Sequence, residues 1–198
     1  MTARRLLLLA AAALAAVGPL AACAPERGGG AQPVRSAGRA DIGGPFALVD
    51  TAGRTVTDAD LRGKPTVMFF GFTFCPEVCP TTLQDMTADL ETLGRAADRL
   101  NVVFVTVDPE RDTPAQLRQY LSSFDPRIRG LTGTPEQVAS MEREFRISSR
   151  RVPLDGGGYT MDHTSYVLLF DERGEFVEPI GYGETPERRR AALRRLLG

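Results

Sequence analysis

Residues 65 to 86 read PTVMFFGFTFCPEVCPTTLQDM, and the fold class follows from this stretch. Its opening part, Pro65 to Phe72, is a continuous apolar run, which is typical of a strand buried on both faces. From Leu83 to Leu100 apolar residues recur at spacings of three and four, which predicts a helix from residue 80 to about residue 99 with one buried stripe. A buried strand followed by a long helix indicates an α/β domain.

The rest of the chain continues this alternation of strands and helices. Residues 101 to 107, NVVFVTV, are the next buried strand. Thr113 and Thr134 each precede a proline, which predicts two helices with an N-cap threonine and a proline at the first helical position. The remaining predicted elements are an opening hairpin (46–54), a strand (165–170), its hairpin partner (175–180) and a closing helix (186–197). We therefore predict a central mixed β-sheet flanked by helices, with an N-terminal β-hairpin extension.

The first 22 residues have the layout of a secretory signal peptide. Arg4 and Arg5 precede an apolar run that is too short for a stable membrane span, and small residues follow it. Residues 20 to 23, LAAC, resemble the bacterial lipobox, in which the cysteine is lipidated and becomes the new N-terminus. The alternative is an ordinary secretory signal in which Cys23 is incidental. We predict a lipid anchor on Cys23 that holds the domain on the extracytoplasmic face of the cell membrane.

A flexible tether and a single domain follow the predicted lipidation site. Residues 23 to 41 are rich in Gly, Pro and small residues, whereas residues 42 to 198 have the length of one domain. The chain carries 24 Lys+Arg and 25 Asp+Glu, and cleavage after residue 22 removes two arginines, so the mature chain has a formal charge of about −3. This balance argues against nucleic acid as a partner.

Cys75 and Cys79 lie at the junction of the buried strand and the long helix. Unpaired backbone N–H groups and the helix dipole favour an anion there, so we expect a lowered pKa for one or both thiols. If both residues belong to the first helical turn, their spacing places the two sulfurs on one solvent-facing side. Three residues separate the cysteines, whereas thioredoxin-like exchange usually uses two. The pair is therefore read as a structural disulfide, a dithiol redox catalyst, or two thiolates that converge on a soft metal ion.

His163 is the only histidine of the chain and lies at the end of a glycine-rich loop, just before a strand. A lone histidine is more often an ordinary core or surface residue than a ligand. Two thiolates and one imidazole, however, form a ligand set that selects copper. The neighbouring Asp162 either orients the imidazole from outside the ligand set or only shapes the turn.

Three segments, in this order and spacing, resemble the Sco/SenC family of membrane-tethered copper chaperones. They read GFTFCPEVCPTTLQDM (71–86), VFVTVDPERDTPAQLRQYLSSFDP (103–126) and DHTSYVLLFDERGEF (162–176), and the resemblance covers residues 42 to 198. It implies a thioredoxin-like fold and a copper site, for Cu(I) or Cu(II), made of Cys75, Cys79 and His163. It also implies a role in assembling the dinuclear copper centre of cytochrome c oxidase subunit II.

Two main roles remain for a chain with this resemblance, and a copper-linked sensor of redox state is a third interpretation. As a copper chaperone, it delivers the metal to subunit II and is not an enzyme. As a thiol-disulfide reductase, it uses Cys75 and Cys79 as catalytic residues and keeps the oxidase subunit or another copper chaperone reduced. Asp108 matches a further family motif, and we interpret it either as a turn after a strand or as a residue that faces a partner.

Overall fold

The structure of the protein is a computed structural model, and it describes residues 41 to 198. The predicted signal peptide, the lipidation site at Cys23 and nearly all of the tether lie outside these residues. Within residues 41 to 198, no helix is long and apolar enough to cross a lipid bilayer.

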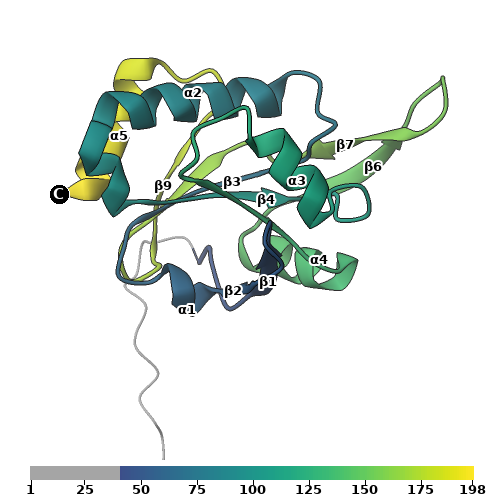
Figure 1. Ribbon diagram of the computed structural model, residues 1–198, viewed down its shortest axis with the longest axis horizontal. Coiled ribbons are helices and arrows are strands. Elements are labelled where there is room, and N and C mark those ends of the chain that lie inside the picture. Colours follow the sequence, from purple (N-terminus) through teal and green to yellow (C-terminus); the bar gives the residue numbers. More distant parts are fainter. Residues whose placement is uncertain (1–40) are drawn as a thin grey trace, which may run out of the picture. The chain divides into compact units, whose positions relative to one another are not determined.

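A seven-stranded mixed sheet forms the centre of the domain (Figure 1). In spatial order it consists of β2 (Thr55–Thr57), β1 (Ala47–Asp50), β5 (Ile128–Thr132), β4 (Asn101–Thr106), β3 (Thr66–Gly71), β8 (Val167–Phe170) and β9 (Phe176–Ile180). The strands β3, β4 and β5 are parallel, and the other neighbouring pairs are antiparallel. Every residue of β3 is buried because β4 and β8 flank it and helices cover the sheet. The predicted mixed sheet with an opening hairpin is thus confirmed.

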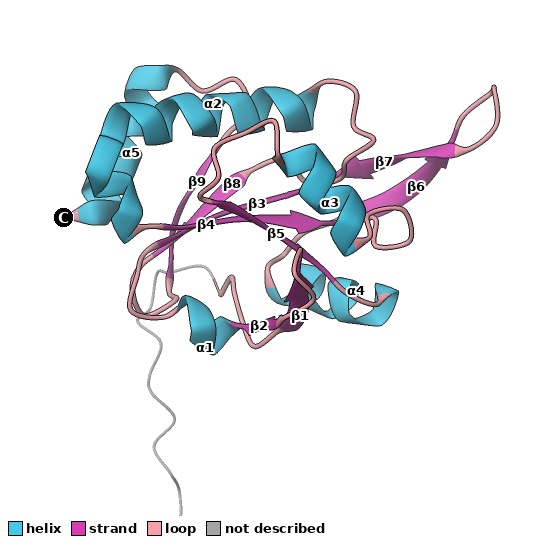
Figure 2. Ribbon diagram, in the orientation of Figure 1, coloured by secondary structure: helices cyan, strands magenta, loops and turns pink. Residues whose placement is uncertain are grey.

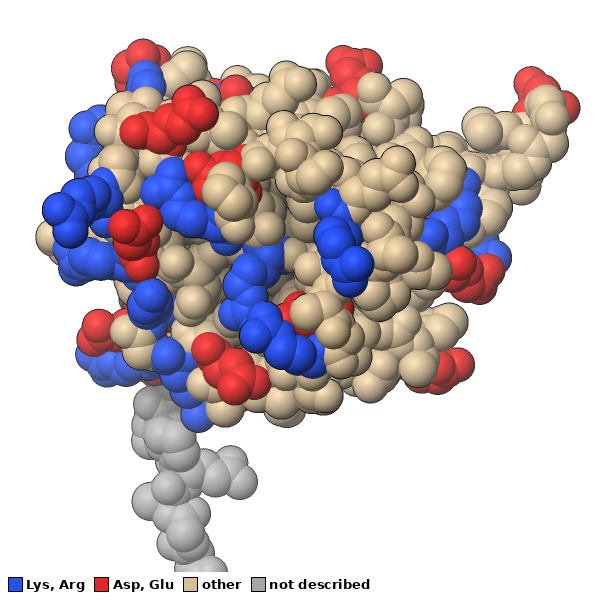
Figure 3. All heavy atoms as spheres, viewed as in Figure 1, with Lys and Arg blue, Asp and Glu red and all other residues tan. Residues whose placement is uncertain are grey.

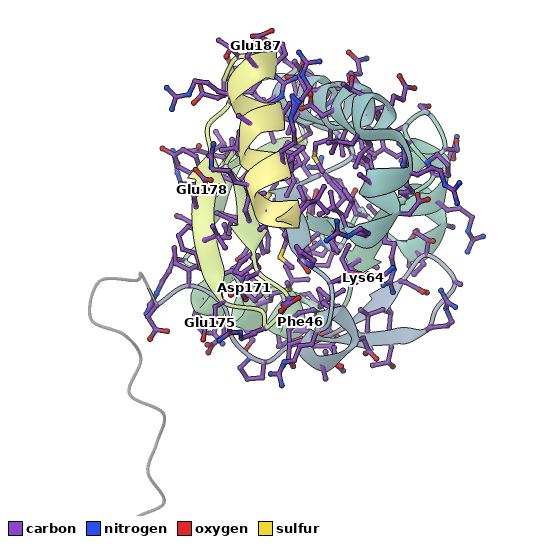
Figure 4. The ribbon with its side chains drawn as sticks, turned by 90° about the vertical axis from the view of Figure 1, so that its left-hand side faces the viewer. Phe46, Lys64, Asp171, Glu175, Glu178 and Glu187 are labelled. Carbon is purple, nitrogen blue, oxygen red and sulfur yellow. The ribbon has the colours of Figure 1, made fainter. Side chains whose placement is uncertain are left out.

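Helices cover both faces of this sheet. In Figure 1, α2 (Val78–Leu93) and α5 (Pro186–Leu197) lie together above the sheet, while α1 (Asp58–Leu61) and α4 (Pro135–Glu144) lie below it. The helix α3 (Pro114–Leu121) packs against β5. An ion pair of 2.8 Å between Arg195 of α5 and Glu178 of β9 joins the last helix to the edge of the sheet. Figure 4 labels Glu178 on this edge strand.

The helix starts predicted at the Thr-Pro pairs are confirmed. Thr113 accepts a hydrogen bond of 3.3 Å from the Gln116 N–H, and Thr134 accepts one of 3.3 Å from the Gln137 N–H. In both helices, proline occupies the first turn, where its missing N–H removes no helical hydrogen bond. Local capping chemistry therefore determines where α3 and α4 begin.

The long helix after the cysteines differs from its prediction at both ends. It begins at Val78 rather than at residue 80, and regular α-helix ends at Leu93. Gly94 has a φ of +56°, a left-handed conformation that ends an α-helix, and a 3-10 helix (η1, Gly94–Arg99) completes the segment. The apolar residues keep their spacing of three to four residues across this break. The same spacing occurs in both types of helix, so it does not show where the α-helix ends.

A two-stranded ribbon of β6 (Ser149–Pro153) and β7 (Tyr159–His163) was not predicted from the sequence. Figure 2 shows this ribbon extending beyond the main sheet. Its strands are rich in polar residues and none of their residues is buried, so they lack the alternating apolar pattern by which strands are recognised. His163 is therefore the last residue of a strand, which corrects its predicted place in a loop.

Basic and acidic side chains are interspersed on the face shown in Figure 3, in agreement with the nearly balanced composition. Exposed ion pairs of this kind contribute at most about 1 kcal/mol each to stability. The stability of the domain therefore depends mainly on its buried apolar core around β3 and β4.

Candidate metal centre

The two cysteines lie on different local structures. Cys75 belongs to the loop that follows β3, whereas Cys79 is the second residue of α2. The condition under which both sulfurs would lie on one face, that both cysteines belong to the first helical turn, is therefore not met. The loop nevertheless brings them together, because the Cys79 N–H donates a hydrogen bond of 3.4 Å to Cys75 Sγ. Cys79 is fully buried and Cys75 is half-buried, so only one of the thiols is open to solvent.

A glycine at the end of β3 makes room for the buried thiol. A Cβ atom at Gly71 would lie 2.8 Å from Cys79 Sγ and 2.8 Å from an edge carbon of the Phe104 ring. Real Cβ atoms do not approach other heavy atoms this closely, so the sulfur packs directly against the backbone of the central strand. The position of Cys79 is therefore set by the sheet as well as by its own helix.

His163 reaches the cysteines from a segment that is 84 residues further along the chain. Its Nε2 atom lies 3.7 Å from Cys79 Sγ, and its Nδ1 atom lies 2.9 Å from the carbonyl oxygen of Thr164. Since a carbonyl oxygen only accepts, Nδ1 carries the proton and the Nε2 lone pair faces the sulfur. The edge of the imidazole also packs against the Phe72 ring at 5.7 Å between centroids. In Figure 1, the start of α2 and the strand β7 meet at the same end of the sheet.

Asp162 does not orient the imidazole. Its carboxylate accepts a hydrogen bond of 2.6 Å from Arg150 on the neighbouring strand β6, and both side chains are exposed. Successive residues of a strand point to opposite faces, so Asp162 and His163 diverge. The backbone carbonyl of Thr164 takes the place that the sequence analysis gave to Asp162.

The structure gives the two thiols opposite acidities. The Cys79 thiol donates a hydrogen bond to Cys75 Sγ, and this bond lowers the pKa of Cys75 to about 4 against the opposing effect of partial burial. The pKa of Cys79 is raised, first by the same hydrogen bond and then by burial and by the charge of Cys75. The metal-free site therefore holds one thiolate, Cys75, and one thiol, Cys79. The prediction of a lowered pKa for one or both thiols is confirmed for Cys75, whereas the hydrogen bond to Cys75 and burial raise the pKa of Cys79.

These acidities predict how Cys75 responds to pH. Because its thiolate is present above about pH 4, we expect its alkylation rate by iodoacetamide to be nearly constant from about pH 5.5 to 8. An ordinary thiol gains about tenfold in rate per pH unit over this range. Cys79→Ala removes the thiol that donates to Cys75 Sγ and should restore this rise. The rates are measured by mass spectrometry of the reduced chain, and a tenfold rise per unit in the unmodified protein would contradict the prediction.

The geometry of Cys79 and His163 suits a shared metal ion. Bonds of about 2.3 Å to sulfur and about 2.0 Å to nitrogen, at angles between tetrahedral and trigonal, hold these atoms about 3.5 to 3.7 Å apart. The observed separation is 3.7 Å. Among residues 41 to 198, no three His, Cys, Asp or Glu side chains already surround a common point. Cys75 Sγ accepts the Cys79 N–H, and a thiolate that accepts one hydrogen bond still has lone pairs for a metal ion.

Arg111, which the sequence analysis missed, bridges the segments that carry the cysteines and the histidine. Its guanidinium donates to the Tyr159 carbonyl at 2.9 Å and lies 3.7 Å from the centre of the Tyr159 ring. On its other side it lies 4.7 Å from the centre of the Phe74 ring, next to Cys75. It also pairs with Asp108, which accepts a hydrogen bond of 2.8 Å from the Tyr159 hydroxyl. A lone arginine in a loop has no local pattern that would reveal this role.

Asp108 is buried within this cluster, so the interpretation that it faces a partner is wrong. Its carbonyl accepts hydrogen bonds of 3.2 Å from the Arg111 N–H and 2.9 Å from the Asp112 N–H. The alternative interpretation, a turn after a strand, is confirmed. Its side chain, only 1% exposed, keeps Arg111 and Tyr159 in place.

Comparisons with known proteins agree with this architecture. The family model SCO1/SenC matches residues 34 to 198. The chain is 36% identical over 154 residues to the protein sco1 of Schizosaccharomyces pombe, covering 76% of this chain and 59% of that protein. It is 39% identical over 147 residues to the mitochondrial SCO1 homolog 1 of Arabidopsis thaliana, covering 74% and 44%. The chain thus spans about half the length of these relatives.

A solved structure of Bradyrhizobium japonicum ScoI with copper bound is 49% identical to this chain, with a TM-score of 0.74. The match covers 78% of this chain and 99% of that structure. This likeness confirms the thioredoxin-like fold that the sequence resemblance implied. With a family model that matches most of its length, the chain belongs to the SCO1/SenC family.

Proposed function

We propose that this protein binds copper at Cys75, Cys79 and His163 and delivers it to the dinuclear copper centre of cytochrome c oxidase subunit II. The observation that carries the proposal is the 3.7 Å approach of Cys79 and His163, with Cys75 beside them. Two sulfurs and an imidazole favour copper over hard cations such as Mg²⁺. The copper-bound ScoI structure and the assignment of Sco proteins to cytochrome c oxidase assembly support the choice of metal and pathway.

The arrangement suits a site that gives up its ion. Thiolates hold Cu(I) well and the imidazole adds a ligand suited to Cu(II), so three residues accept either oxidation state. A three-coordinate ion keeps a position open for a ligand from the receiving protein. Binding requires both cysteines to be reduced and deprotonated, so loading releases a proton from Cys79 and depends on the dithiol-disulfide balance.

We further propose that lipid on Cys23 anchors the protein to the membrane, with its domain on the extracytoplasmic side. The support is the LAAC sequence at residues 20 to 23 after an apolar signal. We expect Cys23→Ser to move the chain from the membrane fraction to the soluble fraction of the producing cell, because it removes the acceptor of the acyl chains. An unchanged membrane fraction would rule out lipid on Cys23 as the anchor.

Copper loading and transfer test the main proposal. After reduction, loading with Cu(I) without oxygen and desalting, we expect about one copper per wild-type chain and none in the Cys75→Ser, Cys79→Ser double variant. Loaded protein mixed with the reduced, metal-free copper domain of subunit II should lose its copper to that domain, and metal analysis of the two proteins after their separation measures the transfer. Copper that stays with the donor would contradict delivery.

The second candidate function is thiol-disulfide reduction. A thiolate on Cys75 beside a buried thiol on Cys79 is an arrangement that can attack a disulfide and then resolve it. A wild-type chain that retains no copper but reduces oxidised subunit II through these cysteines would favour this function. His163→Ala should leave such a reaction largely intact, whereas it should impair copper delivery.

A further inference from the structure

A buried carboxylate with no role in the site described so far lies next to the cysteine loop. Asp112 immediately precedes the N-cap of α3 and is 0% exposed. It accepts three hydrogen bonds: 3.0 Å from the Thr73 N–H, 2.7 Å from the Thr73 hydroxyl and 2.7 Å from the Thr106 hydroxyl. Buried carboxylates are costly unless they are paired in this way, so the three donors stabilise one arrangement of the segments that supply them.

The segment that Asp112 holds is the one on which the cysteines depend. Thr73 lies between Gly71, against which Cys79 Sγ packs, and Cys75, whose N–H donates to the Phe72 carbonyl at 3.3 Å. Gly71 is also the register partner of Thr106, the last residue of β4. Asp112 thus joins the end of β4 to the loop that leaves β3, at the point where that loop turns toward Cys75.

We propose that Asp112 is a positioning residue of the copper site, which holds Thr73 so that the Cys75 loop stays closed against Cys79. This inference rests on the proposed copper-binding function. Asp112 touches neither cysteine, and its effect passes through two hydrogen bonds to one residue. A loop released at Thr73 would let Cys75 move away from Cys79 and would increase the entropy that must be lost when a metal bonds to both sulfurs.

The carboxylate also has an electrostatic effect, which the experiment must separate from positioning. Burial raises the pKa of Asp112, against the opposing hydrogen bonds from Thr106 and Thr73. As an anion, Asp112 contributes to the raised pKa of Cys79. In Asp112→Asn, the amide oxygen can still accept from the Thr73 N–H and the Thr106 hydroxyl, while its N–H donates to the Thr73 hydroxyl oxygen. This variant keeps the positioning contacts and loses the charge, whereas Asp112→Ala loses both.

The test compares the full-length chain and these two variants, reduced and loaded with Cu(I). We expect Asp112→Ala to lose copper to the chelator bathocuproine disulfonate about tenfold faster than wild type, and Asp112→Asn to stay within about twofold. Hydrogen exchange is followed in the metal-free chains. The Thr73 amide should exchange faster in Asp112→Ala and remain protected in Asp112→Asn, because only the alanine variant lacks an acceptor for it.

Asp50→Ala is the matched control. Asp50 is also buried and accepts backbone hydrogen bonds from its own loop, at Ala52 and Arg54, but it lies at the β1–β2 hairpin. We expect it to lower thermal stability without a change in copper loss. If Asp112→Ala does not fold, Thr73→Val, which removes the hydroxyl that donates to Asp112 and accepts from Gln116, should change copper loss and amide exchange in the same directions.

Three results would overturn the proposal. Copper loss in a folded Asp112→Ala variant at the wild-type rate would show that Asp112 does not support the site. Equal losses in Asp112→Asn and Asp112→Ala would assign its effect to charge instead of positioning. An unchanged Thr73 amide exchange in Asp112→Ala would remove the structural link. If the wild type itself binds no copper, the proposed function fails, while the exchange measurement still decides whether Asp112 holds the loop.

Discussion

Replacing His163 with alanine is expected to weaken copper binding at least about 100-fold and to abolish the thiolate-to-Cu(II) absorption of the loaded protein. Replacing a residue that only orients a metal ligand lowers the affinity for the metal about 10- to 100-fold. Replacing the ligand itself should therefore lower this affinity by at least about 100-fold. The Nε2 lone pair faces Cys79 Sγ at 3.7 Å, and the sequence contains no second histidine that could replace it. Cu(II) depends on the nitrogen ligand more than Cu(I) does, so the Cu(II) form should suffer more.

Asp162→Ala provides the control for this measurement. Asp162 is the immediate neighbour of His163, but its carboxylate binds the exposed Arg150 and not the imidazole. We expect copper binding and Cu(II) absorption within about twofold of wild type, because an exposed ion pair contributes little to the local structure. Cu(II) absorption that survives in His163→Ala would exclude the histidine as a ligand. If Asp162→Ala lost as much copper binding as His163→Ala, copper binding would depend on the local structure of the strand and not on the imidazole.

Gly71→Ala is expected to damage stability and copper binding together. The added methyl group would lie 2.8 Å from Cys79 Sγ and 2.8 Å from the Phe104 ring, and both neighbours are fully buried. Overpacking of this kind costs about 1 to 3 kcal/mol in the free energy of unfolding. The sulfur must move to relieve the contact. The separation of Cys79 Sγ from His163 Nε2 should then no longer suit a shared metal ion, and copper should dissociate faster. Chemical denaturation and chelator competition measure the two effects.

Gly156→Ala is the matched control for this substitution. Gly156 lies in the tip between β6 and β7, and a Cβ there would meet no atom within 4 Å. Its stability and copper retention should therefore equal those of wild type. If Gly71→Ala lowers stability but keeps copper as tightly as wild type, the Phe104 ring yields instead of the sulfur, and the packing of Cys79 on the strand does not set the metal geometry.

Much of the fold was open to prediction from the sequence because its signals are local. The apolar run of Pro65 to Phe72 marks a strand that is buried on both faces, and threonine before proline marks the starts of α3 and α4. Each signal spans only a few residues and needs no knowledge of the rest of the chain. The ribbon of β6 and β7 carries no such signal, because its polar strands are defined by pairing with each other and not by burial.

The candidate site likewise has features that the sequence indicates and features that only the tertiary structure shows. The sequence by itself singled out Cys75, Cys79 and His163, because few residue types bind soft metals and the chain has only three cysteines and one histidine. Only the tertiary structure decided that Cys79 is the buried thiol, that the Thr164 carbonyl orients His163, and that Asp112 holds Thr73. The contacts that join Thr73 to Asp112 and Cys79 to His163 span 39 and 84 residues. Burial and long-range hydrogen bonds arise when distant segments pack together, so no local pattern of residues encodes them.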